Sequence, residues 1–125
     1  MDDMEKILLI EDDKEFSEML SLMLEREGYA VERVENGIEG LRMIEKDTFD
    51  LVITDIIMPE KEGLETIMEI RQLKPESKIV AISGGGRSAA GSYLKTAEYF
   101  GATKSFQKPF DKTDFLDAVK NILGA

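Results

Sequence analysis

Short apolar runs alternate with helical patterns along the whole chain, and this alternation restricts the fold more than any other feature of the sequence. Residues 7–10, 51–53 and 79–82 are apolar on both faces and rich in β-branched side chains. Such runs are typical of interior strands in a parallel sheet that is covered on both sides. The more polar run 30–34 suits an edge strand, and residues 105–107 form a weaker fifth candidate.

Between these runs, apolar residues recur at helical spacing. The patterns are carried by Phe16, Met19, Leu20 and Met23; by Ile38 and Leu41; by Leu64, Ile67 and Met68; by Ala90, Tyr93, Leu94 and Ala97; and by Phe115, Val119 and Ile122. Asn36 and Asp111 suit helix N-caps, and Gly28, Gly101 and Gly124 suit helix ends. Strand and helix thus alternate five times, which predicts an α/β protein with right-handed βαβ units and a doubly wound, five-stranded parallel sheet.

Composition excludes several classes of function. The 125 residues include no cysteine and no histidine, so disulfides, thiolate metal sites and histidine catalysis are excluded. With 16 basic and 26 acidic residues, the formal net charge is −10, which disfavours binding to nucleic acid or to an anionic membrane surface. No apolar run approaches the roughly 18 residues that span a membrane. We expect a cytoplasmic protein in which residues 1–125 form a single domain.

Polar side chains stand at the carboxyl ends of the expected strands, where open α/β sheets bind their ligands. In chain order, the residues at these ends are Glu11, Asp12, Asp55, Ser83 and Lys108. Carboxylates without histidine or cysteine select a hard cation such as Mg²⁺, and a carboxylate beside Mg²⁺ is a competent nucleophile for a phosphoryl group. A hydroxyl and an amine can stabilise the phosphoryl oxygens as charge develops. Asp55 is therefore the expected phosphoryl acceptor.

Each of these residues also has a purely structural explanation. Acids that directly precede a helix are often N-caps, and this is the favoured interpretation of Asp13. Glu11 and Asp12 could form a solvated strand end, and Ser83 could start a turn. The gathering of all of them at one rim favours a site over these separate explanations.

The motifs at these positions resemble the response-regulator receiver domain of two-component signalling. The resemblance covers nearly the whole chain and rests on the segments ILLIEDD, DLVITDIIMPEKEG, IVAISG and GATKSFQKPF. It implies a (βα)5 flavodoxin-like fold with strand order 2-1-3-4-5 and a single receiver domain over residues 1–125, without an output domain.

The resemblance also implies roles. Asp55 would accept the phosphoryl group, and Ser83 and Lys108 would bind its oxygens. The metal site would comprise Glu11, Asp12, Asp55 and the backbone carbonyl of Ile57, with Glu11 acting through water or holding the lysine. The donor would be a sensor histidine kinase or a phosphotransfer protein, and the receiver would act on a downstream protein as a monomer or as a phosphorylation-dependent dimer.

One position departs from the family pattern. The family usually carries an aromatic switch residue three positions before the lysine, where this chain has Ser105. Neighbouring strand residues face opposite sides of a sheet, so the adjacent Phe106 cannot replace it. We therefore do not expect the usual coupling between Ser83 and an aromatic rotamer.

Two other functions fit parts of the sequence. A Mg²⁺-dependent aspartyl-phosphate phosphatase would need a second acid two positions after the nucleophile, where this chain has Ile57. A flavodoxin-like module would hold a flavin phosphate in the glycine-rich loop at 84–86, but the acidic rim disfavours an anionic cofactor. We expect a switch that catalyses only its own phosphorylation and autodephosphorylation, rather than an enzyme.

Overall fold

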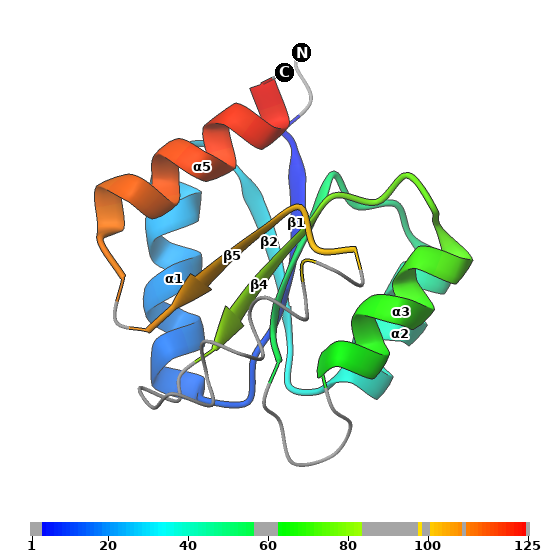
Figure 1. The fold of residues 1–125 in the computed structure, drawn as a ribbon. Helices are drawn as coiled ribbons and strands as arrows, with labels where there is room; N and C mark the ends of the chain where they lie inside the picture. The colour runs from blue at the N-terminus through cyan, green and yellow to red at the C-terminus, as the bar shows by residue number, and fades with distance from the viewer. Residues whose placement is uncertain (1–3, 57–62, 84–97, 99–100, 109, 125) are drawn as a thin grey trace.

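Five parallel strands form one sheet in a computed structural model of the chain, in the order β2-β1-β3-β4-β5 (Figure 1). The structure describes residues 4–56, 63–83, 98, 101–108 and 110–124. The strands are β1 (Lys6–Ile10), β2 (Ala30–Val34), β3 (Leu51–Asp55), β4 (Ile79–Ser83) and β5 (Lys104–Gln107). The helices are α1 (Lys14–Arg26), α2 (Gly37–Lys46), α3 (Gly63–Leu73) and α5 (Lys112–Gly124). The predicted α/β fold and its strand order are confirmed.

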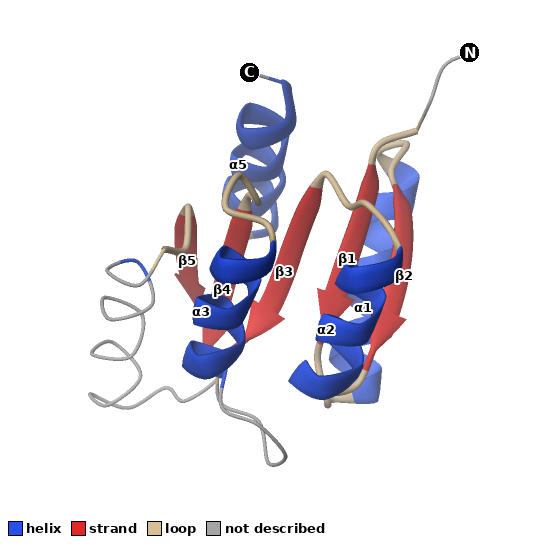
Figure 2. Ribbon diagram, turned by 90° about the vertical axis from the view of Figure 1, so that its right-hand side faces the viewer, coloured by secondary structure: helices blue, strands red, loops and turns tan. Residues whose placement is uncertain are grey.

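Helices cover both faces of the sheet. All five strands run in the same direction, with α2 and α3 on one face and α1 and α5 on the other (Figure 2). Alternate residues of β1 divide between two cores, because successive strand side chains point to opposite faces. Ile7 and Leu9 pack with α1 and α5, whereas Leu8 and Ile10 pack with α2 and α3. The apolar character of the central strands on both faces is thereby explained.

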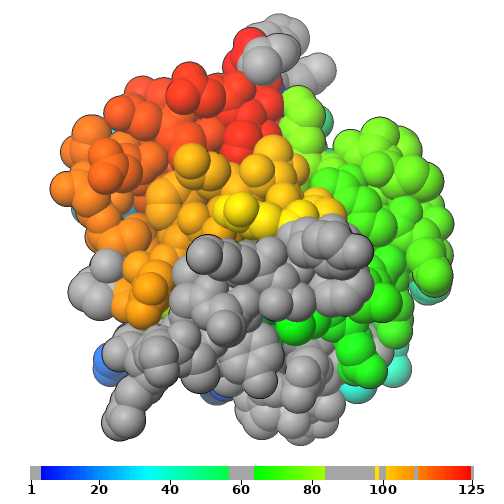
Figure 3. All heavy atoms as spheres, in the orientation of Figure 1, coloured from blue at the N-terminus to red at the C-terminus, as the bar shows by residue number. Residues whose placement is uncertain are grey.

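The two edges of the sheet are the two polar runs that the sequence indicates. Among the described strands, β2 pairs only with β1 and β5 pairs only with β4. On the face drawn in Figure 3, β5 and α5 form a continuous surface beside α3. Because β1, β3 and β4 are the three middle strands of a parallel sheet, their carboxyl ends lie side by side at one rim, and β5 reaches this rim at the edge of the sheet.

The expected helix caps are confirmed at three positions. Asp13, Asn36 and Asp111 each accept a hydrogen bond from the backbone N–H three residues further on, at 3.1, 2.9 and 3.0 Å. The helical pattern at 90–97 lies outside the described residues, but Glu98 is helical. Gly101 follows with a φ of +127°, a conformation that glycine adopts without strain at a helix end.

The predicted buried faces of the helices are partly wrong. Met19, Ile38 and Met68 belong to the predicted apolar stripes, yet all three side chains are exposed. In α1 the buried face instead includes Ser17, Leu20, Ser21 and Leu24, at the spacing i, i+3, i+4, i+7. Both serines are buried, and Ser21 satisfies its hydroxyl by donating to the backbone carbonyl of Glu18. Hydrophobicity alone could not place these serines in the buried face.

Gly40 sets how closely α2 approaches the sheet, and its replacement by alanine is expected to destabilise the fold by about 1–2 kcal/mol. A Cβ atom at this position would lie 2.4 Å from Ile10 Cδ1 and 2.9 Å from Ile10 Cγ1. Ile10 is fully buried, so it has little room to yield, and this outweighs the roughly 1 kcal/mol that alanine contributes to helix propensity. Urea denaturation measures the change. Gly124→Ala is the control because its Cβ would meet no atom within 4 Å; equal stability of both variants would contradict the prediction.

Candidate functional site

Three carboxylates gather at the carboxyl ends of β1 and β3. One oxygen atom from each of Glu11, Asp12 and Asp55 lies within 4.8 Å of the other two. Glu11 and Asp12 directly follow β1, and Asp55 is the last residue of the neighbouring strand β3. Glu11 is 2% exposed and Asp55 is 5% exposed, whereas Asp12 is exposed. The cluster is therefore buried on one side and open to solvent at Asp12.

Lys108 reaches this cluster from the edge of the sheet. Its Nζ atom donates to Glu11 Oε1 at 3.2 Å and to Asp55 Oδ2 at 3.3 Å. Its backbone N–H donates to the carbonyl of Ser83 at 2.7 Å, which fixes the start of the side chain beside the end of β4. The Lys108 side chain is only 19% exposed, so both ion pairs lie in a largely water-excluded environment. Such pairs are screened less by salt than pairs on the surface.

The three carboxylates carry more negative charge than Lys108 neutralises. Burial, and after it the nearby charge of Asp55, raises the pKa of Glu11 to about 7, against the lowering effects of the hydrogen bond from the Asp13 N–H and of Lys108. Burial lowers the pKa of Lys108, but the attraction of Asp55 and Glu11 outweighs burial, and the pKa is raised overall. An additional cation among these oxygens would relieve the repulsion between Glu11 and Asp55.

Ser83 presents a buried hydroxyl at the same rim. It is the last residue of β4, one position after Ile82, which is the register partner of Asp55. The side chain is fully buried, and its Oγ atom has no hydrogen-bond partner among the described residues. An unsatisfied buried hydroxyl costs about 1–3 kcal/mol, so this hydroxyl would gain from an oxygen ligand that enters the site.

Most of the site residues predicted from the sequence are therefore brought to one place. Glu11, Asp12 and Asp55 lie together, Lys108 contacts Glu11 and Asp55, and Ser83 ends the adjacent strand. Ile57, whose carbonyl belongs to the predicted metal site, lies outside the described residues, as do the glycines at 84–86.

Ser105 and Phe106 lie on opposite faces of β5, as predicted from strand geometry. Ser105 pairs in register with Ala81, which packs on the face of α2 and α3, and its hydroxyl donates to Glu98 Oε2 at 2.5 Å. Phe106 packs on the other face, with its ring centre 5.4 Å from that of Phe115 in α5. Ser105 thus stands at the position where an aromatic switch residue is usual, and its side chain is hydrogen-bonded to Glu98.

Phe16 contacts the site, although the sequence indicates only that it belongs to the apolar stripe of a helix. The Nζ atom of Lys108 lies 3.9 Å from the centre of the Phe16 ring. No motif in the sequence indicates this contact, because Phe16 in α1 and Lys108 after β5 lie far apart along the chain and meet only in the folded protein.

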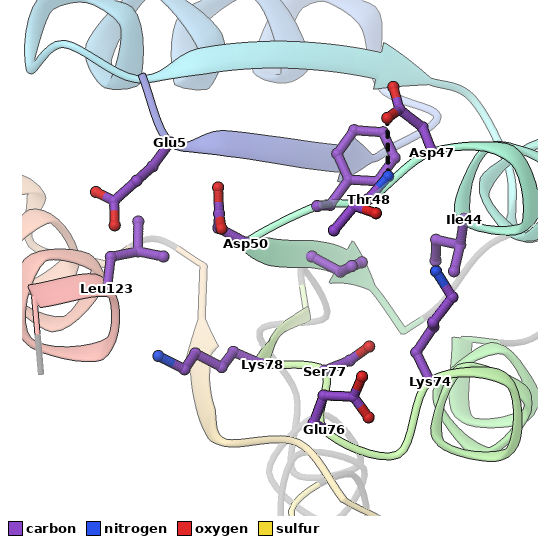
Figure 4. Close-up of a pocket in the computed structure, with 12 residues that line it drawn as sticks. Glu5, Ile44, Asp47, Thr48, Asp50, Lys74, Glu76, Ser77, Lys78 and Leu123 are labelled. Carbon is purple, nitrogen blue, oxygen red and sulfur yellow. Dashed lines mark hydrogen bonds between the residues drawn. The ribbon is translucent and has the colours of Figure 1, made fainter. Parts of the chain in front are cut away.

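A separate cavity of about 380 Å³ opens at the other end of the sheet (Figure 4). Its lining includes Glu5, Asp50 and Lys78, which directly precede β1, β3 and β4. None of the predicted site residues that the structure describes lines it. In open α/β sheets, ligands bind at the carboxyl ends of the strands, so this cavity is distinct from the candidate site.

The fold and the acidic rim first define a class, the doubly wound α/β proteins whose site lies at the carboxyl ends of the strands. Residues 7–120 match the family model of the response regulator receiver domain, and the chain belongs to this family. It is a receiver domain of a two-component response regulator.

Similar proteins support this assignment. The chain is 35% identical over 122 residues to the transcriptional regulatory protein CpxR homolog of Haemophilus influenzae, with 96% of this chain and 51% of that protein covered. It is 32% identical to the response regulator receiver protein CpdR of Brucella abortus, with 96% and 98% covered. The chain thus spans about half of the first relative and nearly all of the second.

A solved structure extends the comparison to three dimensions. The response regulator protein TrrA of Thermotoga maritima, in complex with Mg²⁺-BeF, matches with a TM-score of 0.85 and 34% identity, and 96% of this chain and 100% of that chain are covered. Within the described part of this chain, no helix is both long and apolar enough to cross a membrane.

Proposed function

We propose that this receiver takes a phosphoryl group from a phosphohistidine onto Asp55 in the presence of Mg²⁺, and later loses the group to water. The observation that carries the proposal is the gathering of Glu11, Asp12 and Asp55 within 4.8 Å, with Lys108 in contact with two of the three. The arrangement supplies a nucleophile, a place for a divalent cation and a positive charge for the phosphoryl oxygens.

The residues at the rim fit Mg²⁺ rather than a softer metal. The side-chain donors of the cluster are carboxylate oxygens, and Mg²⁺ is usually held by one or two carboxylates together with water and phosphate oxygens. Asp12 and Asp55 would hold the ion directly, Glu11 would act through water, and the carbonyl of Ile57 would complete the set. When bound, Mg²⁺ neutralises charge on the reacting phosphoryl group. The solved relative from Thermotoga maritima, which contains Mg²⁺-BeF, supports this choice of ion.

The chain's own residues would perform the transfer. An Asp55 carboxylate oxygen attacks phosphorus while the phosphorus–nitrogen bond to the donor histidine breaks, and the histidine leaves with the bonding electron pair. The ammonium of Lys108 and the hydroxyl of Ser83 bind phosphoryl oxygens as charge develops. In the return reaction, water attacks phosphorus, the phosphorus–oxygen bond to Asp55 breaks, and the carboxylate and inorganic phosphate are released.

Phosphorylation would then shift the balance between two conformations. The phosphoryl group of an aspartyl phosphate carries roughly two negative charges, about one more than the carboxylate that it replaces, and its oxygens bind Ser83 and Lys108, at the ends of β4 and β5. A change in these contacts favours the conformation in which they are best satisfied. The donor would be a sensor histidine kinase or a phosphotransfer protein, and the altered surface would be recognised by a downstream protein or by a second receiver.

Removal of Mg²⁺ is expected to prevent phosphorylation and to lower stability. Mg²⁺ at about 100 times its dissociation constant should raise the free energy of unfolding by about 2.7 kcal/mol. Incubation with acetyl phosphate, followed by intact-protein mass spectrometry with and without EDTA, measures the first effect, and thermal denaturation measures the second. Asp12→Asn should weaken Mg²⁺ uptake, whereas Asp13→Asn should not, because Asp13 caps α1. Equal phosphorylation with and without EDTA would refute the metal requirement.

A further inference from the structure

The ammonium group of Lys108 is held on three sides. Two sides are the carboxylates of Glu11 and Asp55, at 3.2 and 3.3 Å. The third is the face of the Phe16 ring, with its centre 3.9 Å from Nζ. A lysine ammonium has three N–H donors, and the face of an aromatic ring attracts a cation through its quadrupole. Two charged contacts and one aromatic contact together account for the coordination of this group.

The ring of Phe16 is itself held by neighbouring aromatic side chains. Its centre lies 6.0 Å from that of Phe110, and the two planes are nearly perpendicular at 80°. Phe110 stacks on Phe115 with centres 4.9 Å apart, and Phe115 is fully buried in the core. Edge-to-face and stacked pairs of this kind are favourable beyond the area that they bury. The aromatic cluster therefore fixes which face of Phe16 is turned towards Lys108.

We propose that Phe16 is a positioning residue for phosphoryl transfer, acting through a cation–π contact that keeps Lys108 aligned. This inference rests on the proposed role of Asp55 as acceptor. During transfer, negative charge moves from the Asp55 carboxylate to the phosphoryl oxygens, so the two charged contacts of Lys108 must change. The contact with Phe16 can persist through this change. It restricts a flexible four-carbon side chain and reduces the reorganisation required when the phosphoryl group arrives.

Stepwise fluorination of Phe16 tests this role with little change in packing, because fluorine withdraws charge from the ring face. We expect the rate of labelling by acetyl phosphate to fall with each fluorine, and to be roughly 3- to 20-fold lower with the trifluorinated ring. The ε-methylene protons of Lys108 should show an upfield ring-current shift by NMR, and Phe16→Leu should remove it. Phe16→Tyr, which keeps the ring, should retain most of the rate. Mg²⁺ affinity and the labelled residue should not change.

The same fluorinated residues at Phe49 provide the matched control. Phe49 also lies beneath a lysine, with Lys6 Nζ 5.2 Å from the ring centre, but Lys6 pairs with Asp47 at the other end of the sheet. Fluorination of Phe49 should leave the labelling rate unchanged. If fluorinated Phe16 variants label Asp55 at the normal rate, the positioning role is wrong and the proposed function stands. If the unmodified protein fails to label Asp55 at all, the proposed function fails and this inference fails with it.

Discussion

Replacement of Asp55 with asparagine is expected to abolish phosphorylation and to leave the fold intact. An asparagine side chain has nearly the same shape as aspartate, but its neutral amide is not a competent nucleophile for a phosphoryl group. The fold should persist because Lys108 keeps its ion pair with Glu11. Loss of the Asp55 charge also removes a repulsion that raises the pKa of Glu11, so this pKa should fall. Intact-protein mass spectrometry after incubation with acetyl phosphate and Mg²⁺ measures labelling, and circular dichroism measures the fold.

Asp13→Asn is the matched control for this experiment. Asp13 is a neighbouring acid, but its carboxylate accepts the N–H of Phe16 at the start of α1, and asparagine caps a helix about as well as aspartate. This variant should be labelled normally. Labelling of Asp55→Asn at another residue, at the rate of the unmodified protein, would show that Asp55 is not the acceptor.

Replacement of Lys108 with methionine is expected to slow phosphorylation by about 100- to 1000-fold, the usual effect of removing one preorganised donor from a developing charge. Methionine has a similar length but carries no charge, so the phosphoryl oxygens would lose the ammonium that faces Asp55. Lys108 also lowers the pKa of Glu11, and in its absence this pKa should rise above about 7. The rate is measured by quenching the acetyl-phosphate reaction over time.

Two controls separate this effect from a general loss of positive charge. Lys120→Met removes a lysine whose partner is Glu27, at 3.2 Å on the surface, and it should be labelled at the normal rate. Mg²⁺ uptake by Lys108→Met should persist, because Asp12 and Asp55, the proposed direct ligands, are unchanged. An undiminished rate in Lys108→Met would exclude a role for the lysine in transfer.

The order of the strands along the chain and the residues at their ends could be predicted from the sequence. Interior strands are marked by apolar runs, and each run stops where a polar residue meets the rim, at Glu11, Asp55 and Ser83. The helix starts at Asp13, Asn36 and Asp111 could also be predicted from the sequence, because a cap is a local hydrogen bond. The order of strands across the sheet came from the family resemblance, and the sheet confirms it.

The rotation of the helices could not be predicted. Met19 and Ile38 have apolar side chains but lie at the surface, whereas Ser17 and Gly40 are buried. At Gly40 a small residue is needed because α2 lies close to the sheet: a Cβ atom there would lie 2.4 Å from Ile10 Cδ1. Hydrophobicity records the burial of side chains and not the approach of one backbone to another.

By itself, the sequence determined which residues end the strands, because hydrophobic periodicity and helix caps depend on neighbours along the chain. Only the tertiary structure decided how those residues meet: the contact of Lys108 with Glu11 and Asp55, the ring of Phe16 against its ammonium, and the bond from Ser105 to Glu98. These contacts depend on strand order and helix packing, which bring together side chains that are distant in the chain. A local pattern carries no information about such distances.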